Sequence, residues 1–301
     1  MVLGERMKIH LTPHRSAFCL KRIEAALLEN MPAWIEPADD GEEADLYVMY
    51  VTGTHDHRVR EAQNIIKAGK QYAVIQLVLG SSRNPRPEEW LDLWEPARLV
   101  WSYYDLSGCL SDYYHAPLGP GSDVFSREEG VEKIYHAGSL GEGAYYKAEC
   151  YGELFWALWQ LPPARGVHIG TGMPANPIVD YFKNPTDNEL RLIYNQCRWF
   201  SCLRRKDGFE MPAVEALLCG TRPIMFDTPN YRQWFDGHAF FIPEEEPAKV
   251  AKNLLNILKR DPDDVPDEEI QEIRRRFDWK RITSGFYDGI SSNPGGGSSG
   301  P

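Results

Sequence analysis

The chain has 301 residues, of which 43% are hydrophobic and 26% charged, a globular balance with enough length for two domains. Its formal net charge of −11 disfavours broad attraction to nucleic acid or anionic lipid. No apolar run is long enough to span a membrane, the N-terminus lacks a signal-peptide pattern, and the six cysteines form no CxxC pair. We therefore expect a cytoplasmic protein with free thiols and no transmembrane segment.

Strands and helices alternate along the first part of the chain. Apolar segments typical of buried strands fall at 7–11, 45–51, 72–79, 98–101 and, more weakly, 113–116. Helical spacing runs to Leu28 and again through Ile65 and Ile66, and a short helix is predicted over 87–93. This order predicts an α/β fold with a parallel, doubly wound sheet.

A segment rich in proline and glycine, 117–125 (PLGPGSDVF), separates this series from a second one. We place the first domain at 1–125, the second at 126–275, a terminal helix at 276–292 that returns to the first domain, and a probable tag or linker remnant at 293–301 (NPGGGSSGP). The second series is predicted to contain strands at 131–136, 167–169 and 178–182, a loop at 138–143 and a helix at 145–159.

The stretch from 187 to 228 reads as helix, strand, charged loop, helix and strand. Asp187 or Asn188 is the predicted cap of the first helix, 199–203 the strand, and 204–211 (RRKDGFEM) the loop. Pro212 fits the first turn of the second helix, which ends at Gly220, and the next strand covers 221–226.

Two carboxylates flank this second helix start, Asp207 in the loop and Glu215 one turn inside. A helix N-terminus attracts phosphate, whereas carboxylates orient hydroxyl groups through charge-assisted hydrogen bonds. A ligand with both kinds of group, a nucleotide sugar, fits the pair. Taken singly, Asp207 could be a solvated turn residue and Glu215 an acid that favours the helix dipole.

The segment resembles the signature of the family-four retaining glycosyltransferases of the GT-B fold (glycosyl transferases group 1). The matching residues are Asp207, Gly208, Phe209, Glu210, Met211, Pro212, Glu215, Ala216, Cys219 and Gly220. Two residues depart from that signature: Asp207 stands where the family usually has glutamate, and Glu210 replaces its second glycine. Gly121, Asp123 and Phe125 are similar to an interdomain segment of the same family.

This resemblance implies a GT-B architecture, with two Rossmann-like doubly wound domains facing across a cleft. It implies that Asp207 holds hydroxyls of the donor sugar, that Gly208, Phe209, Glu210 and Met211 bind the phosphates, and that Glu215 binds the ribose. Lys147 resembles the family's phosphate-binding lysine, although Ser139 and Leu140 stand where an arginine often precedes it; Lys147 can equally be a surface lysine. Arg205 can reach the diphosphate or face solvent.

The implied activity is that of a retaining, hexosyltransferase-like enzyme. It would move a sugar from a UDP- or GDP-linked donor to a hydroxyl of a carbohydrate or small acceptor, with no cofactor and no metal. His55, after the strand 45–51, is the candidate on the acceptor side beside Asp56 and His57, which can equally form a polar turn.

Two alternatives remain open from the sequence. One is a phage-type enzyme that glycosylates a hydroxymethylated base in DNA; the net charge disfavours DNA, although basic residues could still converge at Arg58, Arg60, Arg83, Arg86, Arg204, Arg205 and Lys206. The other is a non-catalytic nucleotide-sugar-binding module, which Glu210 and the missing arginine near Ser139 would explain.

Overall fold

The computed structural model describes residues 6–12, 18–39, 42–51, 55–81, 84–121, 123–205 and 208–292. The chain divides into two compact units. The first contains Met1–Leu118, Asp207–Phe209 and Asp278–Pro301, and the second contains Gly119–Lys206 and Glu210–Phe277. Among the described residues, no helix combines the length and apolar character needed to cross a bilayer.

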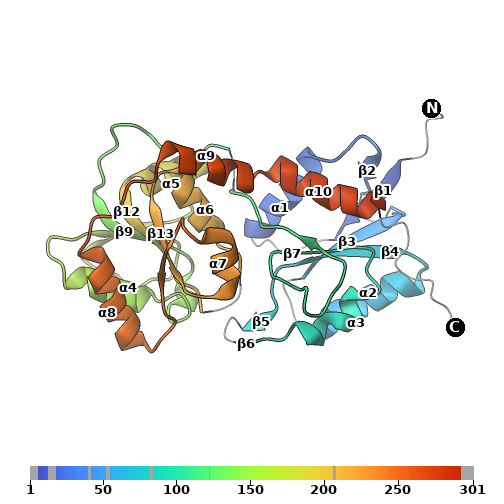
Figure 1. Cartoon of the computed structure of the whole chain (residues 1–301), viewed down its shortest axis with the longest axis horizontal. Helices are drawn as coiled ribbons and strands as arrows, with labels where there is room; N and C mark the ends of the chain where they lie inside the picture. The colour runs from blue at the N-terminus through green and yellow to red at the C-terminus, as the bar shows by residue number, and fades with distance from the viewer. Residues whose placement is uncertain are drawn as a thin grey trace. The chain divides into compact units, whose positions relative to one another are not determined.

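Six parallel strands form the sheet of the first unit, in the order β2-β1-β3-β4-β7-β8. They are β1 (Met7–Leu11), β2 (Ile35–Pro37), β3 (Leu46–Val51), β4 (Gln71–Gln76), β7 (Val100–Ser102) and β8 (Tyr114–His115). Helices α1 (Phe18–Glu29) and α10 (Trp279–Ser292) cover one face, and α2 (His55–Lys67) and α3 (Leu91–Trp94) the other (Figure 1). A short antiparallel pair, β5 (Gly80–Ser81) and β6 (Asn84–Pro85), and a 3-10 helix, η1 (Pro87–Trp90), precede α3.

The central strands of this sheet are apolar on both faces because helices cover both. Val48 to Val51 are each at most 1% exposed. The terminal helix α10 belongs to the same unit. The Tyr287 hydroxyl donates to the Leu27 carbonyl at 2.8 Å, and Arg98 Nε donates to the Ile290 carbonyl at 2.9 Å. The sequence reading missed β2, extended β4 too far, and placed the start of α2 later than His55.

The sheet of the second unit is also parallel, in the order β11-β10-β9-β12-β13-β14. Its strands are β9 (Tyr135–Leu140), β10 (Gly166–Ile169), β11 (Val179–Phe182), β12 (Cys197–Cys202), β13 (Arg222–Phe226) and β14 (Phe240–Ile242). The helices are α4 (Tyr151–Trp159), α5 (Asp187–Asn195), α6 (Met211–Leu218), α7 (Pro229–Phe235), α8 (Pro247–Leu258) and α9 (Asp267–Arg276), with a 3-10 helix η2 (Gly143–Tyr145) after β9. Figure 1 shows α4 and α8 below this sheet and α5 and α6 above it.

Three local predictions for this unit are corrected. Residues 138–140, predicted as loop, continue β9. Gly138 is needed there for packing, because a Cβ at this position would meet the Phe200 ring of β12 at 2.7 Å. The predicted helix over 145–159 begins only at Tyr151, since Cys150 has a left-handed backbone with φ 55°. The cap of α5 is Thr186, which forms a capping box with Glu189.

The strand order places a topological switch point between β9 and β12. The chain proceeds from β9 outward through β10 and β11, then returns to β12 on the other side of β9 and continues to β13 and β14. Loops that leave neighbouring strands at such a point diverge, and open α/β sheets bind ligands in the resulting crevice at the carboxyl ends of the strands. The loops concerned are 141–150 after β9 and 203–210 after β12, in which residues 206 and 207 lie outside the described part of the chain.

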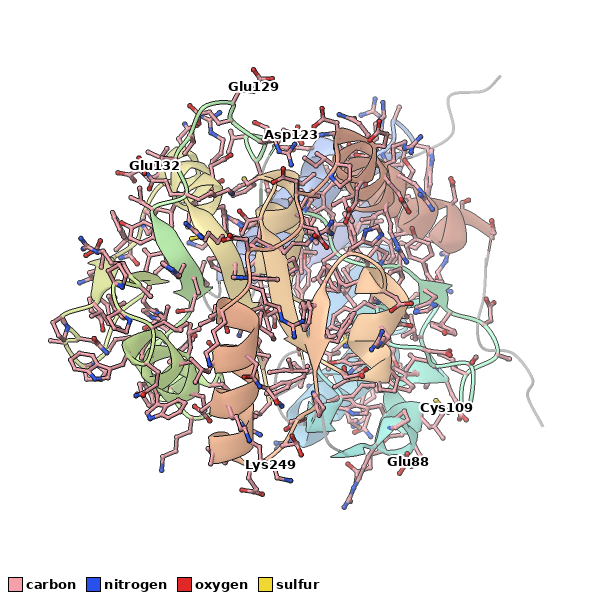
Figure 2. The ribbon with its side chains drawn as sticks, turned by 60° about the vertical axis from the view of Figure 1, so that its left-hand side comes forward. Glu88, Cys109, Asp123, Glu129, Glu132 and Lys249 are labelled. Carbon is pink, nitrogen blue, oxygen red and sulfur yellow. The ribbon has the colours of Figure 1, made fainter. Side chains whose placement is uncertain are left out.

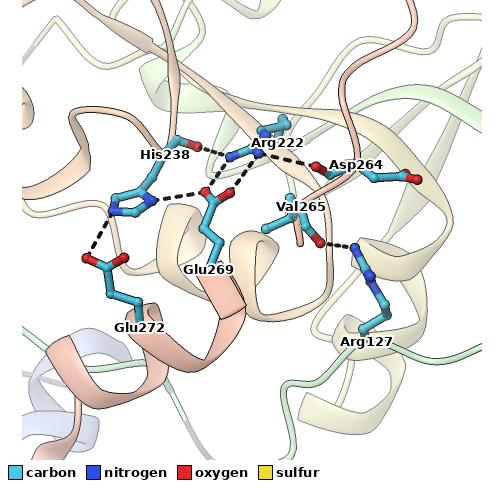
Figure 3. Close-up of polar contacts among 7 residues, drawn as sticks. All are labelled: Arg127, Arg222, His238, Asp264, Val265, Glu269 and Glu272. Atoms are coloured by element: carbon cyan, nitrogen blue, oxygen red, sulfur yellow. Dashed lines mark hydrogen bonds and ion pairs between the residues drawn. The ribbon is translucent and has the colours of Figure 1, made fainter. Parts of the chain in front are cut away.

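Helix α9 is fastened to the second sheet by a charged cluster (Figure 3). Arg222 of β13 forms a paired contact with the Glu269 carboxylate, with Nη2 2.8 Å from Oε2. The His238 ring lies between two acids of α9, with Nδ1 2.9 Å from Glu269 Oε1 and Nε2 3.8 Å from Glu272 Oε1. Burial opposes ionisation of Glu269, but the hydrogen bonds from Arg222 and His238 outweigh it and lower the pKa of that carboxyl.

Candidate active site

The two loops at the switch point contact each other through main chain and side chains. The Arg205 amide donates to the Ala148 carbonyl at 2.7 Å. Beside it, Arg204 Nη1 lies 2.7 Å from Glu149 Oε1. These contacts join the loop after β9 to the loop after β12, directly before the N-terminus of α6.

Arg204 is the centre of a buried charged cluster in the second unit. Its Nε lies 2.5 Å from Glu210 Oε1, so one guanidinium pairs with two carboxylates whose side chains are only 8% (Glu149) and 1% (Glu210) exposed. The Tyr231 hydroxyl of α7 also hydrogen-bonds to Glu210. The side chain of Glu210 therefore points into the domain and its charge is balanced there.

Burial controls the titration of this cluster. It raises the pKa of Glu149 to about 7, since the favourable pairing with Arg204 is opposed by the charges of Glu210 and Glu142. The pKa of Glu210 is also raised by burial, against the effect of Arg204. Burial disfavours the charged guanidinium of Arg204, but Glu210 and Glu149 outweigh it and raise its pKa.

A glycine at the end of β9 makes room for Glu149. Gly141 has φ +153°, and a Cβ there would meet the Tyr151 hydroxyl at 2.0 Å and Glu149 Oε2 at 2.2 Å. The Tyr151 hydroxyl lies between Glu149, which it contacts, and the Leu140 carbonyl at 2.9 Å. A small cavity with room for about one water molecule is lined by these groups and by Ser201, Arg204 and Glu210.

Ser139, which stands where the family resemblance leads one to expect an arginine, faces the inside of the domain. Its hydroxyl lies 2.9 Å from Nδ1 of His168, and Nε2 of that ring lies 3.0 Å from the Gly141 carbonyl. A carbonyl accepts only, so Nε2 carries the proton and Nδ1 accepts from Ser139. Burial lowers the pKa of His168, consistent with a neutral ring that ties β9 to β10.

Glu215, predicted to bind ribose hydroxyls, is 1% exposed on α6. Its Oε1 accepts the Gly121 amide at 2.9 Å, and its Oε2 accepts the Tyr194 hydroxyl at 2.8 Å. Burial, followed by the carboxylate itself, raises the pKa of Tyr194 well above its usual value, so that hydroxyl remains a donor. Each carboxylate oxygen can accept more than one hydrogen bond, so the ribose assignment stays a prediction.

Phe125, in the segment that resembles the family's interdomain stretch, packs within the second unit. Phe125 is fully buried and its ring lies 5.8 Å from that of Tyr194. Asn195 accepts from the Glu128 amide at 2.8 Å and donates to the Ser126 carbonyl at 3.0 Å. Asp123 is exposed, as are Glu129 and Glu132 further along this loop (Figure 2). These contacts explain why 119–125, predicted as the end of the first domain, groups with the second.

The remaining predicted site residues have different positions. Lys147 is exposed in the turn 146–150 and not in a helix. Arg205 is largely buried between Glu153 at 3.7 Å and Glu244 at 3.6 Å, with its guanidinium 5.3 Å from the centre of the Phe226 ring. Asp207 lies outside the described residues.

Four other residues of the predicted site lie at the start of a helix or just before one. Gly208 and Phe209 precede Glu210, the cap residue of α6, and Met211 is its first helical residue. His55 is the first residue of α2 and not part of a loop; its side chain lies outside the described part of the structure.

Sequence reasoning missed the role of Glu149 altogether. In the sequence, Glu149 is an acid before an apolar helix, and Arg204 and Arg205 follow more than fifty positions later. Their spacing gives no indication that they are in contact. Their proximity follows from strand order, because β9 and β12 are neighbours although five elements (η2, α4, β10, β11 and α5) separate them in sequence.

Comparison with known proteins bears on the fold and the class. No family model matches the chain. Over 109 residues it is 25% identical to a GDP-mannose:cellobiosyl-diphosphopolyprenol alpha-mannosyltransferase of Xanthomonas oryzae pv. oryzae (strain PXO99A), a match that covers 35% of this chain and only 29% of that protein.

Solved structures match over much more of the chain. Anabaena HepE, crystallised with UDP and glucose, superimposes with a TM-score of 0.71 at 14% identity, covering 95% of this chain and 100% of that one. A sucrose-phosphate synthase from Thermosynechococcus elongatus gives a TM-score of 0.66 at 13% identity, covering 93% and 80%.

The two parallel sheets and these neighbours give the chain the GT-B fold, so the predicted fold class is confirmed. The similarity to the mannosyltransferase over 109 residues agrees with the resemblance of the chain to GT-B glycosyltransferases of the group 1 type, and it spans less than a third of that relative's length.

Proposed function

We propose that the chain transfers a sugar from a nucleotide-diphosphate sugar to a hydroxyl of a carbohydrate acceptor. The observation that carries this proposal is the position of α6, whose N-terminus follows the loop 203–210 at the switch point of the second sheet. The first N–H groups of a helix have no intrahelical partner, and the helix dipole favours an anion there. A diphosphate is the group that suits this position.

The proteins compared support a nucleotide-sugar donor. The name of the Xanthomonas relative specifies GDP-mannose, and HepE was crystallised with UDP and glucose. For this chain we therefore propose a UDP- or GDP-linked sugar. The acceptor of that relative is a polyprenol-linked sugar by its name, which favours a carbohydrate hydroxyl as acceptor here.

In our proposal the diphosphate is bound by the backbone N–H groups of Gly208 to Met211 and by Lys147. We do not assign it to Arg205, because that guanidinium already lies between Glu153 and Glu244. Asp207 would accept hydrogen bonds from hydroxyls of the sugar, and Glu215 would do so from the ribose.

The proposed reaction retains the anomeric configuration and requires no metal. The bond from C1 of the sugar to the diphosphate breaks with its electron pair on the diphosphate. A bond then forms from the acceptor oxygen to C1 on the same face, and the acceptor proton passes to the departing phosphate oxygen. Helix N–H groups and Lys147 would stabilise the charge that develops there. His55 remains the proposed residue on the acceptor side.

Neither alternative from the sequence is favoured. Of the arginines that could have met DNA, Arg86 pairs with Glu89, while Arg204 and Arg205 pair with acids of the second unit. The charge of Glu210, which suggested a non-catalytic module, is balanced by Arg204.

A thermal-shift panel of UDP- and GDP-sugars, followed by nucleotide-diphosphate release, tests the proposal. Ligands that bind the folded state raise Tm by mass action, so one donor family should stabilise the protein and be turned over. Asp207→Asn should keep the fold and lose most turnover. A panel in which no donor raises Tm or releases nucleotide diphosphate would refute the proposed activity.

A further inference from the structure

The contact between the loops 141–150 and 203–210 has a bearing on the proposed donor site. The first loop carries Lys147, and the second ends at the N-terminus of α6. Both groups would have to reach one diphosphate, although they belong to loops that leave different strands. Some feature of the chain must hold the two loops together.

Among the described residues, a main-chain hydrogen bond and an ion pair contribute to this. The main-chain bond from the Arg205 amide to the Ala148 carbonyl, at 2.7 Å, sets the separation of the loops. The ion pair of Arg204 with Glu149, at 2.7 Å, lies beside it, and Glu149 is the second residue after Lys147. Because Arg204 also binds Glu210 at 2.5 Å, the same guanidinium connects Lys147's loop to the cap residue of α6.

We propose that Glu149 and Arg204 are positioning residues for the donor diphosphate: their contact fixes the loop that carries Lys147 against the N-terminus of α6. This inference rests on the proposed function. Neither side chain needs to touch the donor, since Glu149 is 8% exposed and is engaged with Arg204 and Tyr151. Their contribution is to present Lys147 and the helix N–H groups at a fixed distance from each other.

The positioning contact depends on the charge of Glu149. The groups that face this carboxyl are Arg204 from the loop after β12, Glu210 from the cap of α6, Glu142 from its own loop and Tyr151 from α4. Its pKa of about 7 means that it is protonated in mildly acidic solution and pairs fully with Arg204 only above neutrality. Use of the donor should therefore improve as pH rises through this range.

A double-mutant cycle with Glu149→Gln and Arg204→Lys tests the proposal. Gln keeps the size of the side chain without its charge, and Lys keeps the charge but cannot bridge two carboxylates as a planar guanidinium does. Each single variant should lower kcat/KM for the donor by about 10- to 100-fold, as expected for a displaced loop. The kcat/KM of the double variant should be no lower than that of the less active single variant.

The pH profile provides a readout that loss of packing alone would not change. In the wild type, kcat/KM should rise between pH 6 and 8, on the order of tenfold per unit below the pKa of one ionising group, and Glu149→Gln should remove this rise. Asp261→Asn is the matched control, because it removes an exposed carboxylate that pairs with Arg198 in the same unit. It should leave both kcat/KM and the profile unchanged.

The outcomes separate this inference from the proposed function. If the wild type turns over a donor but folded Glu149→Gln has wild-type kcat/KM and pH profile, the positioning role is wrong. The same holds if the two single effects multiply in the double variant. If the wild type neither binds nor turns over any donor, the proposed function fails, and this inference with it.

Discussion

At the scale of single residues, the second unit depends on a cluster in which one cation serves two buried anions. Removing Arg204 leaves Glu149 and Glu210 unpaired, whereas removing either acid leaves a balanced pair. Breaking a buried ion pair is far more costly than removing an exposed one, because the remaining charge is not solvated. Removing Arg204 should therefore destabilise the fold more than removing Glu149 or Glu210.

We expect Arg204→Met to lower the free energy of unfolding by about 3 kcal/mol at pH 8, and Glu149→Gln to lower it by less. Arg198→Met is the control, since its pair with Asp261 is exposed and should contribute about 0–1 kcal/mol. Urea unfolding followed by circular dichroism measures all three. Equal losses for Arg204→Met and Arg198→Met would show that the cluster does not stabilise the domain.

Glu149 should also make stability depend on pH in a direction unusual for a carboxyl group. Its pKa of about 7 in the folded protein lies above its ordinary 4.5, so the folded state holds the proton more tightly. This contribution to stability is present below the unfolded pKa and is lost as pH rises through the folded pKa. The difference in unfolding free energy, wild type minus Glu149→Gln, should therefore be larger at pH 5 than at pH 8. An identical difference at both values would contradict the raised pKa.

How far single residues could be predicted varies with what determines their position. The start of the helix at Pro212 could be predicted, because proline fits the first helical turn, where its missing N–H costs no hydrogen bond. The direction of the Glu210 side chain could not be predicted from the sequence. It depends on Arg204, whose proximity comes from the loop after β12, and Glu215 likewise meets Gly121 only through the packing of a distant segment.

At the scale of elements, residues that start and stop a helix allowed α6 to be predicted from the sequence. Pro212 lies in the first turn of α6, and Gly220 has φ +72° just after the helix, a conformation that glycine adopts without strain. The strand β9 was misplaced for the opposite reason. Gly138 within it reads as a loop residue, and only the Phe200 ring packed against it explains the glycine.

Helix α9 was missed by the sequence analysis, which placed a helix only over 276–292, and the contacts that anchor α9 cannot be read from the sequence. Arg222 and His238 both contact Glu269 (Figure 3). The neighbouring Glu268 lies in the same first turn and is exposed.

Glu268 and Glu269 can be compared directly by substitution. Both interact favourably with the helix dipole, so the difference between their effects on the free energy of unfolding measures the contacts of Glu269 with Arg222 and His238. We expect Glu269→Gln to lower the free energy of unfolding by about 2 kcal/mol, the scale of hydrogen bonds to a charged group, and Glu268→Gln to lower it by less than about 0.5 kcal/mol. Chemical denaturation near pH 7 gives both values, and similar losses would argue against an anchoring role for Glu269.

At the scale of the whole molecule, alternation of strands and helices was sufficient to predict two parallel sheets and, with the signature segment, the GT-B fold. Strand order was not available from the sequence, although it decides which loops meet. The order β10-β9-β12-β13 creates the switch point, and with it the neighbourhood of Glu149, Arg204 and α6. For that reason the fold could be predicted from local residues, while the contacts that support the proposed site could not.

The proposed activity is the transfer of a sugar from a nucleotide-diphosphate donor with retention of configuration. Proton NMR of donor hydrolysis, recorded before the released sugar mutarotates, tests it most directly. We predict release of the nucleotide diphosphate together with a first-formed sugar of the same anomeric configuration as the donor, and loss of both signals in Asp207→Asn. The opposite anomer would contradict retention, and the absence of release from every UDP- and GDP-sugar would contradict the transferase itself.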